Sequence, residues 1–449
     1  MIKTYQQAIN FINRFAQSDQ NKYSGRIGLN RQQYILSLLG DPQDQIKTIH
    51  VAGTSGKGST SFYLSSLLVS HGFNVGLTLS PHLLDIRERM LINNQLISQD
   101  EFVYYLNQII PAIQAAKLKK YGQPGYFELL LLLSFYIFSQ KKVDYVILET
   151  GIGGLLDSSN TISRSDKICL FTKFGLDHTS ILGPNIKSIA TQKAGIIHPF
   201  NPVFSVNQIE ISKDVLNKTA QNNQTSVNFI GSKKSFKNIK LNNYSISYDF
   251  SSSFLKLKTL VINTIGIFQV ENSAIALTVF LFLSQRDNFS FNESKIRQTL
   301  SETKFYGRMD LNFINNKPAI LDGAHNPQKF RAMIKSLKMF FPHQKFTIIL
   351  AYKKRADFSK MVSLVASLAS NITITSLIQK DRSSSDYIND RKSLNTIFQK
   401  NPQINFQIIP NYVSAFNTAI KSNLPVLITG SLYLVGNLYP LVVKQKNKK

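Results

Sequence analysis

Short apolar runs alternate along this chain with longer segments in which apolar residues recur about once per helical turn. The runs are typical of buried strands and the longer segments of amphipathic helices, so the first part of the chain is predicted to be an α/β domain with a parallel sheet. The predicted strands are Ile49–Ala52, Asn74–Leu79, Tyr145–Leu148 and Ile168–Phe171. The predicted helices are Tyr5–Phe15, Gln32–Leu39, Ser61–Ser70, Ser98–Ala116, Leu129–Phe138, Ser188–Ile197 and Gly266–Ser284.

Three stretches have a weaker pattern. Arg87–Asn94 alternates like a strand closed by a turn, and residues 201–260 indicate further strands and polar loops. The polar segment Gln285–Leu300 is expected to be helical. A helix start is clearest at Ser98, because Glu101 stands at the position that completes a capping box.

A second α/β unit is predicted from Pro318 onward. Its short strands alternate with helical segments, which again indicates a parallel sheet. We therefore expect a larger α/β domain at 1–302, a linker at 303–317 and a smaller Rossmann-like domain at 318–449. The strands predicted for the smaller domain are Ala319–Leu321, Thr347–Leu350, Ile372–Ser376, Ile404–Ile409 and Pro425–Thr429.

The segment between the first long strand and its helix has the composition of a phosphate-binding loop. It reads Gly53-Thr54-Ser55-Gly56-Lys57-Gly58-Ser59-Thr60. Glycines allow backbone angles that a Cβ forbids, so successive amides at the helix start can surround an anion. Lys57 adds a cation, and the hydroxyl of Ser59 or Thr60 can face Mg²⁺. The spacing differs from that of the general P-loop, which predicts a variant loop.

Polar residues follow other predicted strands at the same edge of the sheet, where α/β proteins bind ligands. Ser80, Glu149 and His178 come after three of these strands and could converge on one cation. A carboxylate followed by glycines suits Mg²⁺ beside phosphates. The spacing is equally compatible with a simple turn at Ser80 and a structural role for His178. Nothing in the local sequence distinguishes Lys193 from other surface lysines.

Composition limits the class of protein. The 449 residues are 43% hydrophobic and 17% charged, which is typical of a globular chain. A single cysteine, Cys169, and the absence of an apolar leader or a long apolar stretch predict a cytoplasmic protein with no membrane segment. The formal charge of +26 could indicate nucleic-acid binding. The basic residues are scattered, however, so we expect small polyanionic substrates and no nucleic acid.

Taken together and in order, the motifs resemble the folylpolyglutamate synthase/dihydrofolate synthase family of Mur-type amide ligases. The similarity extends from about residue 25 to residue 438. The matching segments are Gly53–Thr60, Ser80-Pro81-His82, Glu149–Gly154, Asp177-His178, Lys193–Ile196, Asp322–Pro327 and Gly430–Gly436.

This resemblance implies an ATP-dependent ligase with a Mur-ligase-like fold. ATP would convert a carboxylate of dihydropteroate or a reduced folate into an acyl phosphate, and the amino group of L-glutamate would then form an amide. The catalytic residues implied are Lys57, Lys193, His178 and His325. The loop 53–60 would bind ATP, together with three further residues, Asn272, Arg308 and Asp322.

The resemblance also implies two Mg²⁺ sites. Ser80, Glu149 and His178 would bind one ion, and Lys193, carbamylated on Nζ, would supply an oxygen ligand for the second. Oxygen ligands suit this hard cation, whereas a bare ammonium would be repelled by it. A monomer is expected, as is usual in the family.

Some positions depart from the family pattern. Leu155 replaces an arginine, Phe268 replaces a histidine and Asp85 replaces a frequent basic residue. A stretch matched only loosely is Lys353–Asp357. These changes leave the pterin and the number of glutamates undetermined. The alternatives are a Mur-type ligase for a different carboxylate and amino acid, a basic P-loop ATPase that binds nucleic acid, and a nucleotide-binding protein that has lost ligase activity.

Overall fold

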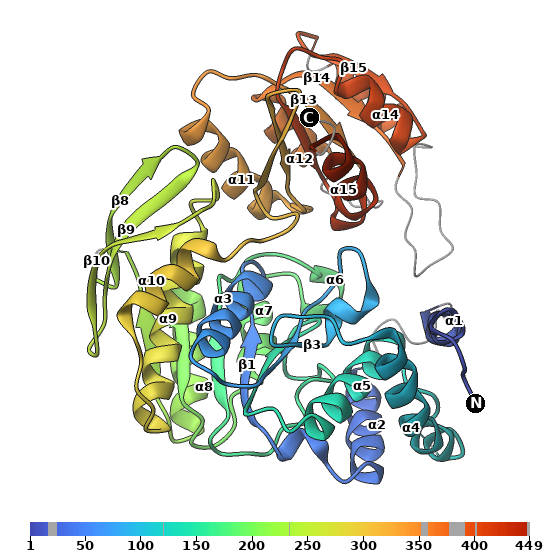
Figure 1. Ribbon diagram of the computed structural model, residues 1–449, viewed down its shortest axis with the longest axis vertical. Helices are drawn as coiled ribbons and strands as arrows, with labels where there is room; N and C mark the ends of the chain where they lie inside the picture. The colour runs from blue at the N-terminus through green and yellow to red at the C-terminus, as the bar shows by residue number, and fades with distance from the viewer. Residues whose placement is uncertain are drawn as a thin grey trace. The chain divides into compact units, whose positions relative to one another are not determined.

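The computed structural model describes residues 1–16, 25–119, 121–232, 234–351, 358–376, 391–399 and 402–446. The chain divides into two compact units. The first unit comprises residues 1–238, 248–260 and 270–301, and the second comprises residues 239–247, 261–269 and 302–449. Each unit is built around its own sheet (Figure 1).

Within the described residues, the first unit contains a seven-stranded sheet in the order β3-β2-β4-β1-β5-β6-β7. Its strands are parallel except β3, which pairs antiparallel with β2. The strand that leads into the phosphate loop is central, so its end is flanked by those of β4 and β5. The strands are β1 (Lys47–Ala52), β2 (Val75–Thr78), β3 (Leu91–Ile92), β4 (Tyr145–Glu149), β5 (Ile168–Phe171), β6 (Val203–Val206) and β7 (Val227–Ile230).

Helices surround this sheet (Figure 1). The most apolar one, α5, buries Leu129 and Leu133 completely. The capping box predicted at the start of α4 is confirmed, because Glu101 N donates to Ser98 Oγ over 3.0 Å. The helices are α1 (Tyr5–Ala16), α2 (Gly25–Leu38), α3 (Lys57–Ser70), α4 (Gln99–Lys117), α5 (Tyr126–Gln140), α6 (Thr179–Leu182), α7 (Ile186–Ala194), α8 (Glu210–Asn222), α9 (Gln269–Arg286) and α10 (Glu293–Glu302).

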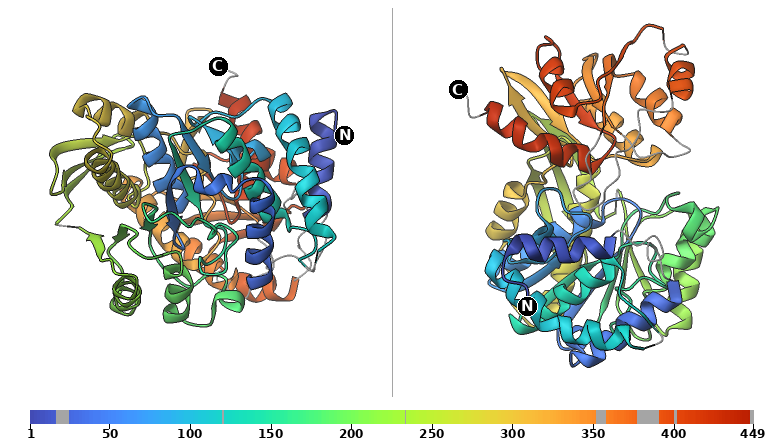
Figure 2. Two further views of the ribbon diagram at one scale, coloured as in Figure 1. Left: turned by 90° about the horizontal axis from the view of Figure 1, so that it is seen from below. Right: turned by 90° about the vertical axis from the view of Figure 1, so that its right-hand side faces the viewer.

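The second unit has its own six-stranded sheet over the described residues, in the order β11-β12-β16-β13-β14-β15. Figure 2 shows its strands and helices from two further directions. The strands are β11 (Asp310–Ile314), β12 (Lys317–Leu321), β13 (Phe346–Leu350), β14 (Ala369–Ile374), β15 (Asn405–Ile408) and β16 (Val426–Thr429). The helices are α11 (Pro327–Phe340), α12 (Phe358–Ala366), α13 (Arg391–Gln399), α14 (Tyr412–Ala419) and α15 (Leu432–Lys446).

A separate sheet, in the order β10-β9-β8, accounts for much of the 201–260 stretch. Its strands are β8 (Phe236–Asn242), β9 (Ser245–Ser251) and β10 (Lys256–Ile262). The boundary between the two units runs through these strands.

The α/β class is confirmed, and several local predictions need correction. Residues 210–222, expected to be strand or loop, form α8, and residues 86–89 form a 3₁₀ helix at the start of the expected strand 87–94. The expected helix Gln285–Leu300 is interrupted, because α9 ends at Arg286 and α10 begins at Glu293. The expected linker 303–317 contains β11, which pairs antiparallel with β12.

Candidate active site

The phosphate loop joins the end of β1 to α3, and the helix begins at Lys57 rather than at Ser61. Gly56 is the residue before the helix and has φ 94°, with no side chain capping the first amides. The loop is attached to the end of β5, because the amides of Thr54 and Ser55 donate to Lys173 O over 2.9 and 3.1 Å. Strand, loop and helix therefore form the arrangement that binds phosphate groups at a helix N-terminus.

Two glycines of the loop are closely surrounded. A Cβ on Gly53 would lie 1.9 Å from Thr172 Oγ1, and a Cβ on Gly56 would lie 2.5 Å from Asn272 Oδ1. Asn272, in the first turn of α9, also accepts a hydrogen bond from Thr60 Oγ1 over 3.4 Å. The structure thus brings Asn272 against the loop, as a nucleotide-contacting residue requires.

Gly56→Ala is expected to raise the KM for ATP at least about tenfold, since the methyl group would displace Asn272. Gly72 provides a matched control, because it has the same φ of 94° and a Cβ added there would meet nothing within 4 Å. Both substitutions should lower the free energy of unfolding by about 1–2 kcal/mol, the cost of a left-handed backbone for a residue with a Cβ. Equal effects of the two substitutions on the KM would contradict the assignment of the loop.

Two lysines and a carboxylate meet beside the loop. Lys57 Nζ donates to Gly53 O over 3.3 Å and lies 3.6 Å from Glu149 Oε1. Lys193, on α7, donates from Nζ to the same Gly53 O over 2.8 Å and is only 4% exposed. Lysines from α3 and α7 therefore share one carbonyl oxygen of the loop, and Glu149 at the end of β4 lies beside one of them. The sequence around Lys193 had given no local sign of this placement.

Glu149 also contacts the Ser80 segment. Ser80 N donates to Glu149 Oε2 over 3.1 Å, and Glu149 N donates to Thr78 Oγ1 over 2.9 Å. His178 lies at the start of α6 with a left-handed φ of 50°. Among the described residues, no three His, Cys, Asp or Glu side chains form a group that could hold a metal ion. Mg²⁺ here would need the Ser80 hydroxyl or a modified Lys193 in addition to Glu149, and these oxygen donors fit a hard cation.

A small pocket with a volume of about 20 Å³ opens beside Ser80 and Glu149. Apolar side chains and several polar ones line it together. Arg89 is held at the pocket, because its Nε donates to His82 Nδ1 over 2.9 Å and its guanidinium lies 5.5 Å from the ring centre of Tyr126. The lining residues are Thr78, Leu79, Ser80, Arg89, Phe127, Leu130, Leu131, Ser134 and Glu149.

The glycine-rich segment after Glu149 packs on the helix that carries Lys193. Leu155 N donates to Gln192 O over 2.6 Å, and a Cβ on Gly195 would lie within 2.4 Å of Leu155 Cβ. Asp157 accepts hydrogen bonds from Ile152 N at 2.7 Å and from Ser159 N and Oγ. Burial raises the pKa of this carboxyl group, while the hydrogen bonds from Ser159 oppose the increase.

In the second unit, the predicted residues lie near the ends of β12 and β16. These two strands are parallel neighbours. Asp322 follows β12 and accepts hydrogen bonds from Met309 N and Ala324 N, both over 2.9 Å. Gly430, just after β16, donates to Ala324 O over 3.0 Å. Burial raises the pKa of Asp322 to about 6, although the two amides and the charge of Arg308 act in the opposite direction.

Asp322→Asn is expected to flatten the dependence of stability on pH. In the unfolded chain this carboxyl group ionises near pH 4, whereas in the folded protein its pKa is raised to about 6. The free energy of unfolding should therefore fall as the pH rises from about 4 to about 6, by about 3 kcal/mol. Urea unfolding of the ligand-free protein across this range measures the effect. A wild-type curve no steeper than that of the variant would contradict it.

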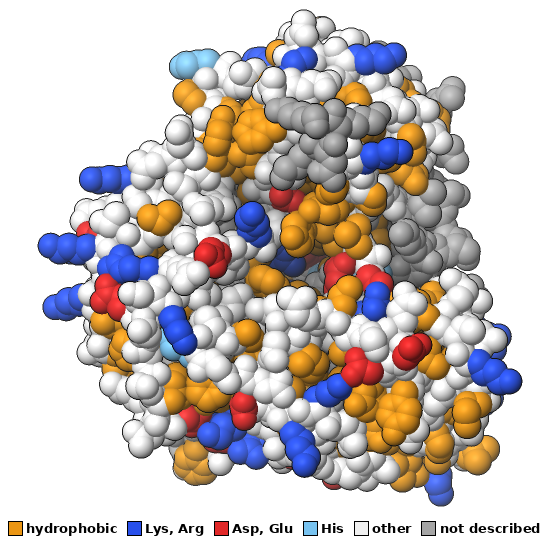
Figure 3. Space-filling view, viewed as in Figure 1, with side chains coloured by type: hydrophobic (Ala, Val, Ile, Leu, Met, Phe, Trp, Pro, Cys, Tyr) orange, Lys and Arg blue, Asp and Glu red, His pale blue; other side chains and the backbone are white. Residues whose placement is uncertain are grey.

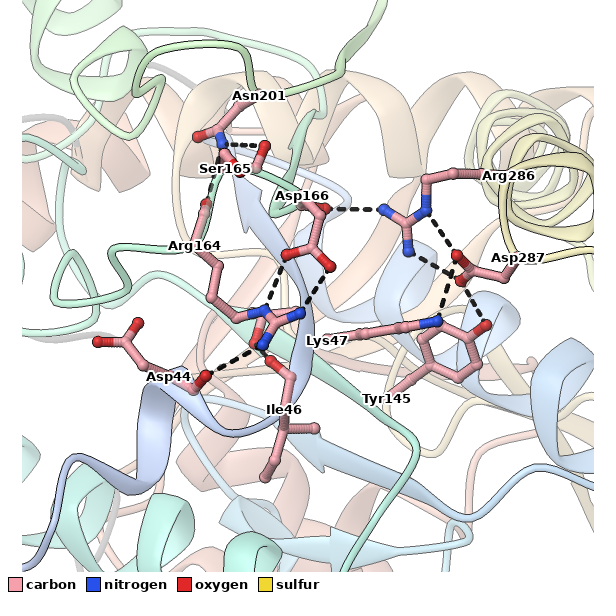
Figure 4. A network of polar contacts seen from close by, with 11 residues as sticks. Asp44, Ile46, Lys47, Tyr145, Arg164, Ser165, Asp166, Asn201, Arg286 and Asp287 are labelled. Atoms are coloured by element: carbon pink, nitrogen blue, oxygen red, sulfur yellow. Dashed lines mark hydrogen bonds and ion pairs between the residues drawn. The ribbon is translucent and has the colours of Figure 1, made fainter.

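At the opposite end of the first sheet, where β1 and β4 begin, a network of charged groups stabilises the fold (Figure 4). At the amino ends of β1 and β4, Lys47 lies 3.3 Å from Asp287 and Tyr145 donates to Asp287 over 2.6 Å. Arg286 bonds the same carboxylate and donates to Asp166 O over 2.7 Å. Burial raises the pKa of Asp287, but hydrogen bonds from Arg286 and Tyr145 outweigh it and lower the pKa to about 2. The network fixes the last turn of α9, whose first turn carries Asn272.

Sequence reasoning missed several residues that the structure places at these sites. Thr172 lies against Gly53, Arg89 and Phe127 line the pocket, and Lys329 contacts His325. Thr172 directly follows β5, and this position at a strand end could have identified it as a candidate site residue. Arg89 and Phe127 come from a 3₁₀ helix and from α5, whereas Lys329 lies only four residues after His325. The loosely matched stretch Lys353–Asp357 lies outside the described residues.

Comparison with known proteins identifies relatives over nearly the whole chain. Residues 105–280 match the Mur ligase middle domain, and residues 308–441 match the dihydrofolate synthetase C-terminal domain. A dihydrofolate synthase/folylpolyglutamate synthase of Bacillus subtilis is 27% identical over 440 residues, which cover 98% of this chain and 99% of that protein. A dihydrofolate synthetase of Saccharomyces cerevisiae is 26% identical over 428 residues, covering 92% and 97%. A solved FPGS–AMPPCP–folate complex has a TM-score of 0.80 at 25% identity and covers 98% of this chain and 100% of its own.

Proposed function

We propose, since the chain belongs to the folylpolyglutamate and dihydrofolate synthase family with its Mur ligase middle domain, that it is an ATP-dependent ligase adding L-glutamate to folates. The observation that carries this proposal is the convergence of Lys57, Lys193 and Glu149 at the phosphate loop. Relatives with the same activity in their names align along almost the entire chain.

The reaction divides into two transfers. A carboxylate oxygen of the acceptor attacks the γ-phosphorus of ATP, which releases ADP and gives an acyl phosphate. The amino group of glutamate then attacks the acyl carbon, phosphate leaves, and the nitrogen loses a proton as the amide forms. Neither transfer requires covalent participation by the protein, so the chain acts by positioning and by neutralising charge.

In the first unit, the phosphate loop and Lys57 would hold the triphosphate, with Asn272 on the nucleotide side of the loop. Ser80, Glu149, His178 and a carbamylated Lys193 are the proposed Mg²⁺ ligands. Bound Mg²⁺ supplies charge neutralisation for the phosphate oxygens. The burial of Lys193 supports the proposed carbamylation of its Nζ, because a side chain that is 4% exposed is protected from bulk water.

We propose that the acceptor lies against the mouth of the pocket beside Ser80, which itself has room for about one water molecule. The ring of Phe127 and the side chains of Leu130 and Leu131 offer apolar contact, while Arg89 and Ser80 supply polar groups. An acceptor lying there would have one end next to Glu149. This arrangement matches a substrate with an aromatic body and a reacting carboxylate.

In the second unit, Arg308, Asp322 and His325 are the proposed contacts to nucleotide and phosphate. Asp322 is fixed by two amides, so its carboxyl group has a defined orientation. The chain is proposed to act as a cytoplasmic monomer. Cys169 is buried and free, and no described helix is long and apolar enough to cross a membrane.

No observation favours the nucleic-acid alternative. On the face shown in Figure 3, lysine and arginine side chains are spread among acidic and uncharged ones. The basic residues behind the +26 net charge are scattered along the chain, which suits attraction of small anions.

Glutamate-dependent release of ADP from Mg²⁺-ATP tests the proposal. Purified protein is given dihydropteroate or tetrahydrofolate in parallel reactions, with and without L-glutamate. Turnover with the first acceptor alone identifies a dihydrofolate synthase, with the second alone a polyglutamate synthase, and with both a bifunctional enzyme. Bound ATP without glutamate-dependent turnover on either acceptor would contradict the proposed function.

A further inference from the structure

One pair of side chains in the second unit is explained neither by the fold nor by the sequence motifs. Lys329 lies in the first turn of α11, four residues after His325. Its backbone position is fixed, since Lys329 N donates over 2.9 Å to the side chain of Asn326, which is fully buried. Its side chain reaches back, so that Nζ lies 3.0 Å from His325 Nε2.

Two contacts of His325 bear on where its proton lies. His325 Nδ1 is 2.8 Å from Gly323 O, and a carbonyl oxygen can only accept a hydrogen bond. The Lys329 ammonium can only donate, so Nε2 must offer its lone pair. Both contacts are satisfied by one species alone, the neutral imidazole with its proton on Nδ1.

The surrounding charges are consistent with this species. Lys329 and Arg308 both act on the buried Asp322 carboxyl group, so two cations influence one titratable acid here. A second positive charge on the imidazole, 3.0 Å from the Lys329 ammonium, would be repelled. The donor at the Nε2 side of His325 is therefore the lysine and not the histidine.

We propose that Lys329 is a positioning residue that holds His325 neutral with its proton on Nδ1, and that Lys329 provides the positive charge of this turn. The inference deepens the proposed function, in which His325 lies near the reacting phosphates. An anionic group that approaches this side of the imidazole would meet the ammonium of Lys329. The roles of the two residues are thereby divided, with the charge on the lysine and a hydrogen-bond acceptor on the histidine.

The tautomer can be measured without any turnover. Histidine side-chain ¹⁵N NMR of the full-length protein distinguishes a protonated Nδ1 from a protonated Nε2, and His325→Gln identifies the signal among the seven histidines. We expect a protonated Nδ1 and an unprotonated Nε2 in the wild type, and in Lys329→Met we expect Nε2 of His325 to take up a proton at a higher pH than in the wild type. Lys338→Met, at an exposed position of the same helix, should leave the signal unchanged. A neutral wild-type imidazole with its proton on Nε2, or protonation of His325 at the same pH in Lys329→Met as in the wild type, would overturn the proposal.

Kinetics provide the second readout. Lys329→Met is expected to lower kcat about 10-fold to 100-fold by removing one charged donor, and Lys329→Arg should recover most of the loss. Lys338→Met should turn over like the wild type. If wild-type protein shows no ligase activity, the proposed function fails while the NMR result still decides the tautomer. Wild-type kcat in Lys329→Met would show that the lysine carries no functional charge.

Discussion

Lys57→Ala should lower kcat by about 10³-fold, the largest loss expected from a single side chain of the phosphate loop. In the structure Nζ of Lys57 lies 3.3 Å from Gly53 O and 3.6 Å from Glu149 Oε1. The cation is therefore held at the loop before any substrate binds, and little reorganisation is needed when charge develops on the transferred phosphoryl group. Its removal also leaves Glu149, 4% exposed, without this opposite charge.

The measurement is steady-state ADP release at saturating ATP, together with thermal unfolding. Lys218→Ala, at an exposed position of α8, removes an equal charge from the same unit and should leave kcat unchanged. The side chain of Lys57 is itself only 15% exposed, so the melting temperature must be compared before the rate is interpreted. A folded Lys57→Ala protein with a kcat within about threefold of the wild type would refute the assignment of the loop.

The local parts of the site could be predicted because their signals are contiguous in sequence. The glycines, lysine and hydroxyls of residues 53–60 stand next to one another, and the apolar run before them marks the strand. Parallel strands also present their carboxyl ends at one edge, so Ser80 and Glu149 could be expected together. The structure confirms this neighbourhood through the hydrogen bond between Ser80 N and Glu149.

Contacts between distant segments could not be predicted in the same way. Lys193 lies 140 residues from Gly53 in sequence, yet its ammonium reaches the carbonyl oxygen of that residue. Asn272 lies 212 residues from Thr60, to which it is hydrogen-bonded. Only the resemblance indicated roles for these two residues. Their placement depends on how α7 and α9 pack on the sheet, which no local pattern encodes.

Secondary-structure errors arose where tertiary contacts outweigh weak local preference. The helix α8 has few apolar residues, and it is fixed to the first unit mainly by its buried Leu216 and Ala220. The helix α2 begins at Gly25, seven residues before the predicted start, and its buried Arg31 pairs with Glu128 over 2.7 Å. An ion pair between residues 31 and 128 leaves no sign in either local segment.

Lys193→Ala is the second substitution from which we expect nearly complete loss of activity, by about 10³-fold or more in kcat. Lys193 donates to Gly53 O over 2.8 Å and is 4% exposed, so it lies at the loop rather than on the surface. If Nζ is carbamylated, the substitution removes an anionic oxygen ligand where the phosphates are to be neutralised. Lys193→Arg should be equally inactive, because a guanidinium retains the positive charge but forms no carbamate.

Chemical rescue separates the carbamate from a simple cation. Small carboxylates such as acetate or propionate can enter the space left in Lys193→Ala and should restore part of its activity, in proportion to their concentration, while having no such effect on Lys193→Arg. Lys187→Ala, at an exposed position of the same helix, is the matched control and should behave like the wild type. Labelling with ¹³C-bicarbonate should give one carbamate signal in the wild type that is absent from Lys193→Ala. Full activity in Lys193→Arg would exclude the carbamate and leave a positive charge as the function of this side chain.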